Sequence, residues 1–80
     1  MKIYDFDGKK NICGLRIKEI RKRLGLTQDD LAAKLQVSGV EIERNSISRI
    51  ESGDRFVADY ELRTLSEILG VSPSYLLGLE

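Results

Sequence analysis

The sequence predicts an all-α fold, in which a compact domain of five short helices follows a short N-terminal arm. Apolar residues recur at intervals of three and four over most of the chain, and helix-capping residues or glycines separate the periodic segments. The 80 residues are enough for one small domain with a core near the lower limit for independent folding. We therefore divide the chain into an arm, 1–11, and a domain, 12–80.

The arm has no helical period. Tyr4 and Phe6 alternate with Asp5 and Asp7, which is typical of a short extended segment. Disorder is the alternative at a chain terminus, and the sequence leaves both open.

The first helix is expected over about 14–24. Its apolar residues fall at i, i+3 and i+7, on Ile17, Ile20 and Leu24. Gly25 is the expected stop, because glycine readily adopts the positive φ found just after a helix end.

The second helix is expected over about 28–36, with Thr27 as its N-cap. Asp30 lies three residues after Thr27 and gives an acidic variant of the capping box. The expected buried residues are Leu31, Ala32 and Leu35.

The third helix is expected over about 44–52, after a stretch without helical period in which Ser38-Gly39 signals a turn. Ile47 and Ile50 are spaced to face inward, and Gly53 is expected to close the helix.

A fourth helix is expected over about 60–69, with Asp59 as N-cap and Gly70 as its end. Its expected buried residues are Leu62, Leu65, Ile68 and Leu69. Ser72-Pro73 then predicts a cap and a first helical proline for a short fifth helix through Leu77.

Net charge gives no simple indication of a partner, because 13 basic and 13 acidic residues cancel. The distribution is uneven: residues 1–40 hold nine Lys or Arg against five acids, and residues 41–80 hold four against eight. Affinity for phosphate follows the local field rather than the total. The Arg21-Lys22-Arg23 run is equally consistent with a solubilising surface and with a phosphate contact.

Composition argues against several classes of function. The chain has no histidine, no glycine-rich phosphate loop and no metal-spaced Cys/His set, so neither an enzyme nor a cofactor or metal site is expected. The lone Cys13 is expected to be a small buried side chain rather than a redox thiol, which fits a cytoplasmic setting. No apolar run reaches membrane-spanning length, and no small-molecule ligand is expected.

The second and third helices together have the pattern of a helix-turn-helix. Ala32 and Ala33 supply small residues where two helices would cross, and the neighbouring Leu and Ile side chains supply the packing. The outward face of the third helix would carry Arg44, Asn45 and Ser48, with Arg49 at its flank. Arginine and asparagine are the side chains that read guanine and adenine edges in the major groove. Gln28 would lie with the free N–H groups of the second helix near a phosphate.

The chain resembles the phage repressor and Cro-type (xenobiotic-response-element type) helix-turn-helix family over about residues 14–78. The matching residues are Arg21-Lys22, Leu26-Thr27-Gln28, Leu31-Ala32, Ile47-Ser48-Arg49-Ile50-Glu51, Gly53, Leu69-Gly70-Val71-Ser72 and Leu76-Leu77-Gly78. The resemblance implies the five-helix domain of that family. It also implies sequence-specific binding of double-stranded DNA by a small phage or bacterial transcriptional regulator. We expect this regulator to be a repressor.

Residue roles follow from the same resemblance. The base-reading positions of the family fall on Arg44, Asn45 and Arg49. The phosphate-contacting positions fall on Gln28, Ser46, Ser48, Ser52 and Arg55. The family's acid at Glu51 is structural and implies an ion pair with a first-helix arginine, for which Arg21 is the nearest candidate.

The sequence departs from the family between the second and third helices. Gln36-Val37-Ser38 resembles the usual turn, yet Ile47 follows five residues too late. Counting back from Ile47 places Ile42 in the valine position and Glu43 in the cap position, and we prefer this alignment. Glu41 and Glu43 would then lie near the expected phosphates.

Two alternatives stay open. Leu76, Leu77 and Leu79 fit either a homodimer contact through the C-terminal helices or a plain core role. The neutral charge and the acidic second half also fit a protein-interaction module, such as an antitoxin-like partner, that keeps this fold without reading DNA.

Overall fold

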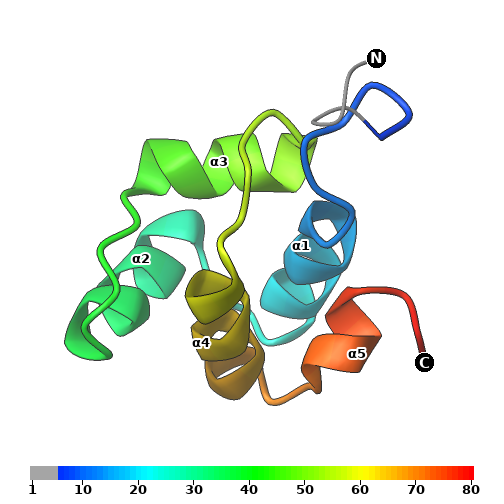
Figure 1. Cartoon of the computed structure of the whole chain (residues 1–80). Helices are drawn as coiled ribbons and strands as arrows, with labels where there is room; N and C mark the ends of the chain where they lie inside the picture. The colour runs from blue at the N-terminus through cyan, green and yellow to red at the C-terminus, as the bar shows by residue number, and fades with distance from the viewer. Residues whose placement is uncertain (1–5) are drawn as a thin grey trace.

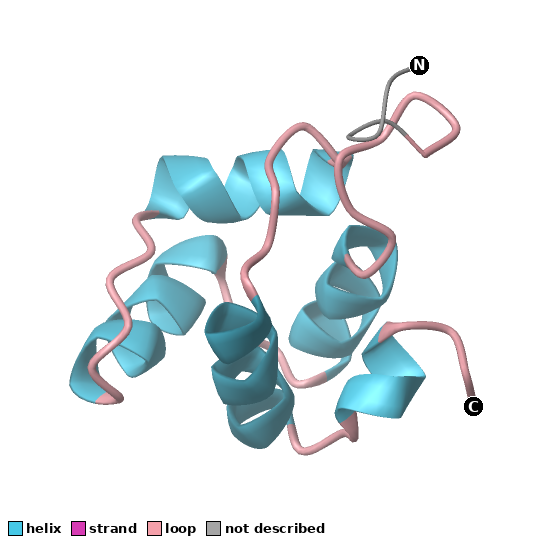
Figure 2. Cartoon of the chain, in the orientation of Figure 1, coloured by secondary structure: helices cyan, strands magenta, loops and turns pink. Residues whose placement is uncertain are grey.

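A computed structural model describes residues 6–80, and in this part of the chain five helices and no strand are found. The helices are α1 (Gly14–Arg23), α2 (Gln28–Val37), α3 (Arg44–Ser52), α4 (Asp59–Leu69) and α5 (Pro73–Leu76) (Figure 1). Loops alone join them (Figure 2). The predicted all-α fold is confirmed.

The boundary between α1 and α2 is set by local capping, as predicted. Gly25 has a φ of +74° and donates to the carbonyl of Lys22, while the N–H of Leu26 donates to that of Arg21. This pair of bonds satisfies the last carbonyls of α1. Thr27 Oγ1 accepts from the N–H of Asp30 at 3.0 Å, and Asp30 Oδ2 accepts from the N–H of Thr27 at 2.9 Å. These bonds from Thr27 lower the pKa of Asp30.

The start of α4 differs from the prediction. Asp59 is the first helical residue, and the N-cap is Ala58, whose side chain cannot accept a hydrogen bond. The N–H of Ala58 donates instead to Glu61 Oε1 at 2.9 Å. Because Arg55 holds Glu61 in place, this helix start is capped from inside the helix.

The short last helix has the predicted cap. Ser72 Oγ accepts from the N–H of Tyr75 at 3.0 Å, and Pro73 is the first helical residue. The helix ends at Leu76, one residue earlier than expected.

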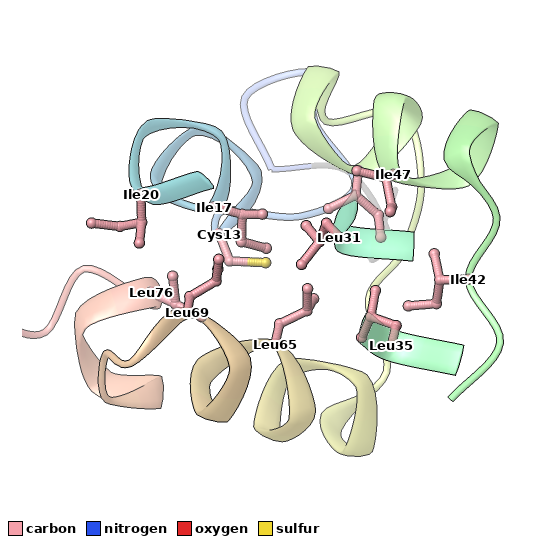
Figure 3. Packing of buried hydrophobic residues seen from close by; sticks show 11 residues of the cluster. Cys13, Ile17, Ile20, Leu31, Leu35, Ile42, Ile47, Leu65, Leu69 and Leu76 are labelled. Carbon is pink, nitrogen blue, oxygen red and sulfur yellow. The ribbon is translucent and has the colours of Figure 1, made fainter. Parts of the chain in front are cut away.

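The core lies where all five helices converge, and Figure 3 shows its side chains pointing toward one another. Its fully buried apolar residues are Cys13, Ile17, Ile20, Leu31, Leu35, Ile42, Ile47, Ile50, Leu65, Leu69 and Leu76. Ala32, Leu62 and Ile68, which were expected inside, are partly buried.

Two further expectations about burial were wrong. Leu24 is 52% exposed, because α1 ends before it, and Leu26 packs against the core instead. Ala33 is exposed on α2, so only Ala32 serves as the small residue at the crossing with α3.

The first turn of α1 passes unusually close to α3. A Cβ atom added to Gly14 would lie 2.0 Å from the carbonyl oxygen of Ile50, a backbone atom that cannot turn aside. Glycine at this position therefore sets how closely the two helices approach.

Candidate nucleic-acid interface

The inner and outer faces of α3 are cleanly separated. Ile47 and Ile50 are each 1% exposed, whereas Arg44, Asn45, Ser48 and Arg49 are exposed and Ser46 is half-buried. The helix lies along one edge of the molecule, across α1 and α2 (Figure 1). The predicted base-reading residues Arg44, Asn45 and Arg49 thus share one solvent-facing surface with Ser48, and we call these four residues the α3 face.

The long turn places Ile42 inside and Val37 outside. Val37 is 89% exposed, and Ile42 is 3% exposed and belongs to the core. Since the residue in the valine position of the motif packs under the following helix, this burial favours the alignment with the longer turn. Glu43 is the N-cap of α3 through its backbone, and its carboxylate accepts no capping hydrogen bond.

A buried polar network connects the three helices around the motif. Arg21 Nε and Nη2 donate to the two carboxylate oxygens of Glu51 at 2.6 and 3.0 Å, and Nη1 donates to the carbonyl of Leu26 at 2.8 Å. The Arg21 and Glu51 side chains are 8% and 4% exposed. The hydrogen bond to Glu51 raises the pKa of Arg21. The implied ion pair is confirmed, and Arg21 is a structural residue, while Lys22 and Arg23 are exposed.

Gln28 joins this network. Its Nε2 donates to Glu51 Oε1 at 3.1 Å, so the first residue of α2 is fixed to the last turn of α3. The family resemblance implies a phosphate contact for Gln28, and its bond to Glu51 was not predicted.

Charges near the start of α3 are mixed. Arg44 Nε lies 4.0 Å from Asp29 Oδ1, and both side chains are largely exposed. Such a pair contributes little to stability. Glu41 and Glu43 are exposed on the turn beside it.

Two more of the predicted phosphate contacts, Ser52 and Arg55, lie at the end of α3 and in the loop that follows it. Ser52 Oγ lies within hydrogen-bond distance of the carbonyl of Arg49 and of Asp54 Oδ2, at 3.1 and 2.9 Å. Arg55 forms a two-pronged ion pair with Glu61, at 3.0 and 3.1 Å, and donates to the carbonyl of Phe56. The hydrogen bond to Glu61 raises the pKa of Arg55.

The segment before α1 packs on the end of α3, which sequence reasoning missed. Asn11 Nδ2 donates to the carbonyls of Ile50 and Arg55 at 3.0 and 2.8 Å, and its Oδ1 accepts from the N–H of Gly14 at 2.8 Å. Lys9 Nζ donates to the carbonyl of Ser52 at 3.0 Å. An asparagine three residues before a helix start was the available signal.

The predicted arm is a tight turn where it is described. The backbones of Phe6 and Lys9 exchange two hydrogen bonds, of 2.8 and 2.9 Å. Tyr4 and Asp5, part of the expected alternation, lie outside the described residues.

Cys13 is a core residue at the start of α1. It is 3% exposed, and burial raises the pKa of its thiol to about 11. Because the thiolate is the reactive form, this environment favours the expected packing role over a redox role.

A family model described as a helix-turn-helix domain matches residues 14–80, nearly the whole domain. The chain belongs to the helix-turn-helix family of the phage-repressor and Cro type. The family and the fold are those of DNA-binding regulators. No curated protein sequence matches the chain.

Solved structures of the family are similar to this helix-turn-helix domain. The P22 c2 repressor, solved in complex with a synthetic operator, has a TM-score of 0.73 at 31% identity, over 88% of this chain and 98% of that one. The biofilm regulator SinR, solved in complex with DNA, gives 0.69 at 33% identity, over 81% and 97%. The restriction-modification controller C.AhdI from Aeromonas hydrophila gives 0.67 at 31% identity, over 80% and 86%.

The C-terminal leucines of the helix-turn-helix domain differ in exposure, which bears on whether each has a core role or forms a homodimer contact. Leu76 is fully buried in the core, whereas Leu77 and Leu79 are 36% and 75% exposed.

Within residues 6–80, no helix combines the length and apolar character that a membrane crossing requires.

Proposed function

We propose that the chain binds double-stranded DNA sequence-specifically as a transcriptional repressor, with α3 in the major groove. The observation that carries the proposal is the α3 face, where two arginines and an asparagine project from a helix whose opposite side is anchored in the core. Arginine and asparagine side chains can each donate two hydrogen bonds to the edge of one base, guanine and adenine respectively. The similarity to P22 c2 and SinR, each solved with DNA, supports it.

In this proposal Arg44, Asn45 and Arg49 read bases. The phosphate-contacting positions are Gln28, Ser46, Ser48, Ser52 and Arg55, and the charge of Arg55 is shared with Glu61. Glu51 holds Gln28 at the N-terminus of α2, where the free N–H groups of the helix favour an anion. The same bond turns the glutamine toward α3, so Gln28 sits at the edge of the proposed base contacts.

The experiment is a selection of random duplex DNA with the purified chain at low salt, followed by affinity measurements on the selected site. Arg49→Ala is expected to lower specific affinity by roughly 1–3 kcal/mol and to relax one base position. Arg63→Ala removes an exposed arginine from α4 and serves as the matched control. An equal loss for Arg49→Ala on selected and random DNA contradicts a base-reading role.

The proposal includes a homodimer through the C-terminal region, supported by the exposed Leu77 and Leu79. A two-fold dimer would place its half-sites about one helical turn of DNA apart. Sedimentation of the chain with and without the selected DNA tests this, and Leu79→Glu is expected to shift the free chain from dimer to monomer and to weaken the binding of two protomers to one full site. A single half-site in every selected sequence argues against the dimer.

The second candidate is a protein-interaction module. The exposed acids Asp29, Glu41 and Glu43 beside the start of α3 favour it, because like charge there opposes phosphate. A selection that enriches no sequence at low salt, together with a protein partner that co-purifies in fixed stoichiometry, supports this candidate over the first.

A further inference from the structure

The cation predicted to contact phosphate after α3 is largely neutralised. Both prongs of the Arg55 guanidinium are bonded to Glu61, which is only 6% exposed. Withdrawing Arg55 toward a phosphate would leave a buried carboxylate without its partner, which is costly. This end of the proposed interface therefore has a gap in positive charge.

Residues 9 and 10 bring two lysines to the same place. The N–H of Lys10 donates to the carbonyl of Gly53 at 2.8 Å, which fixes the segment against the end of α3. The ammonium of Lys9 is engaged with the carbonyl of Ser52 and completes the helix end.

The side chain of Lys10 is exposed to solvent. Its Nζ lies 5.6 Å from the centre of the Phe56 ring, in the loop that follows α3, and the residue is exposed. The hydrogen bonds of Asn11 on one side and of Lys9 on the other hold its backbone in place. A lysine with an anchored backbone loses less freedom when it binds than one on a loose arm.

The segment lies on the side of the molecule that α3 faces. In Figure 1 the described residues before α1 and the first part of the loop after α3 lie beside the C-terminal end of α3 in the upper part of the view, while α4 and α5 lie in the lower part. DNA docked on the α3 face would extend past the helix end toward Lys10.

We propose that Lys10 contacts a DNA phosphate and supplies the charge that Arg55 gives up to Glu61. This inference rests on the proposed function and adds to it a positioning residue from outside the helix-turn-helix motif. Since a phosphate contact carries no sequence information, Lys10 should strengthen binding to selected and random DNA alike.

The test is the salt dependence of affinity for the selected DNA. Each neutralised phosphate contributes about −0.9 to the slope of log affinity against log salt concentration. Lys10→Gln is expected to make the slope shallower by about that amount, with similar losses on selected and random DNA. Lys10→Arg is expected to retain the slope of the unmodified chain.

Lys34→Gln is the matched control, because Lys34 is an exposed lysine on the side of α2 that faces Ile68 of α4. It removes the same unit of charge far from the α3 face, so it reports the effect of net charge alone. Thermal melting of each variant verifies that it is folded, and the Lys10 backbone bond to Gly53 is retained in both substitutions.

The outcomes separate the two proposals. If the slope for Lys10→Gln equals that of the unmodified chain or of Lys34→Gln while specific binding persists, the Lys10 contact is wrong and the proposed function stands. If the unmodified chain binds no duplex at low salt, both are overturned.

Discussion

Arg21 and Glu51 face each other across the α1–α3 contact and share two hydrogen bonds, of 2.6 and 3.0 Å, at a site closed to solvent. Gln28 of α2 donates to the same carboxylate. One acidic side chain therefore sets the position of α3 relative to both preceding helices. In the proposed function the orientation of α3 decides which bases its outer side chains reach, so this network would link stability to recognition.

Glu51→Gln is expected to lower the free energy of unfolding by roughly 3–5 kcal/mol, since the buried guanidinium loses its counter-charge. Urea unfolding followed by circular dichroism measures this. The double variant Arg21→Met/Glu51→Leu should recover a large part of the loss, because it removes both charges. A double variant less stable than Glu51→Gln alone would mean that packing, not the unpaired charge, dominates.

Ile42→Ala is expected to lower the free energy of unfolding by about 2–5 kcal/mol, because the side chain is almost fully buried in the core. Val37→Ala, in the residue that resembles the usual turn, should change stability by less than about 0.5 kcal/mol, since Val37 is open to solvent. Thermal or urea unfolding of the two variants tests the alignment with the longer turn, in which Ile42 takes the valine position. Equal effects at the two positions would contradict it.

Gly14→Ala is expected to destabilise the domain by about 1–3 kcal/mol, because its new methyl group would meet the backbone of Ile50. In an uncrowded helix the same change would stabilise by about 1 kcal/mol, so the sign of the effect is diagnostic. Leu15→Ala, at the exposed neighbouring position, is the control. Amide hydrogen exchange in the last turn of α3 should increase in Gly14→Ala and remain unchanged in the control.

Stability should fall in acid partly through Glu61. Burial acts to raise its pKa, but hydrogen bonds from Arg55 and from the N–H of Ala58 outweigh burial and lower the pKa below 4.5. The ionised group therefore stabilises the fold fully above about pH 4.5, and this contribution is lost as the pH falls through the folded-state pKa.

Urea midpoints measured from pH 7 to pH 3 test this. The difference between the unmodified chain and Glu61→Gln is expected to shrink as the pH falls below about 4.5. Glu67→Gln changes an exposed acid of the same helix and should show a small difference at every pH. A constant gap for Glu61→Gln would rule out the lowered pKa as its cause.

The sequence predicted the elements whose signals are local. The Thr27–Asp30 box, the Ser72-Pro73 start and the glycine after α1 each depend on residues within a few positions, and each is confirmed. The start of α4 was misplaced because its cap depends on Glu61, which Arg55 holds in turn. The preference of aspartate for the N-cap position, which favoured Asp59, was outweighed by the bonds of Glu61 to Ala58 and Arg55.

Contacts between residues far apart in the sequence could not be predicted from local patterns. Asn11 bonds to carbonyls 39 and 44 residues away, and no periodicity reports such a partner. The resemblance to a family supplied the Arg21–Glu51 pair, yet it gave no indication that Gln28 shares it. Which side chains touch DNA stays a prediction, supported by their shared outer face.

The anchored segment before α1 also bears on where this domain begins. The family model starts at Gly14, but the last carbonyls of α3 find their donors in Lys9, Lys10 and Asn11. A polypeptide that begins at Gly14 would leave those carbonyls to water and loosen the C-terminal end of α3. We therefore expect a domain that includes residues 9–13 to be more stable than one that begins at Gly14, and a fusion joined directly at Gly14 to report on a weakened domain.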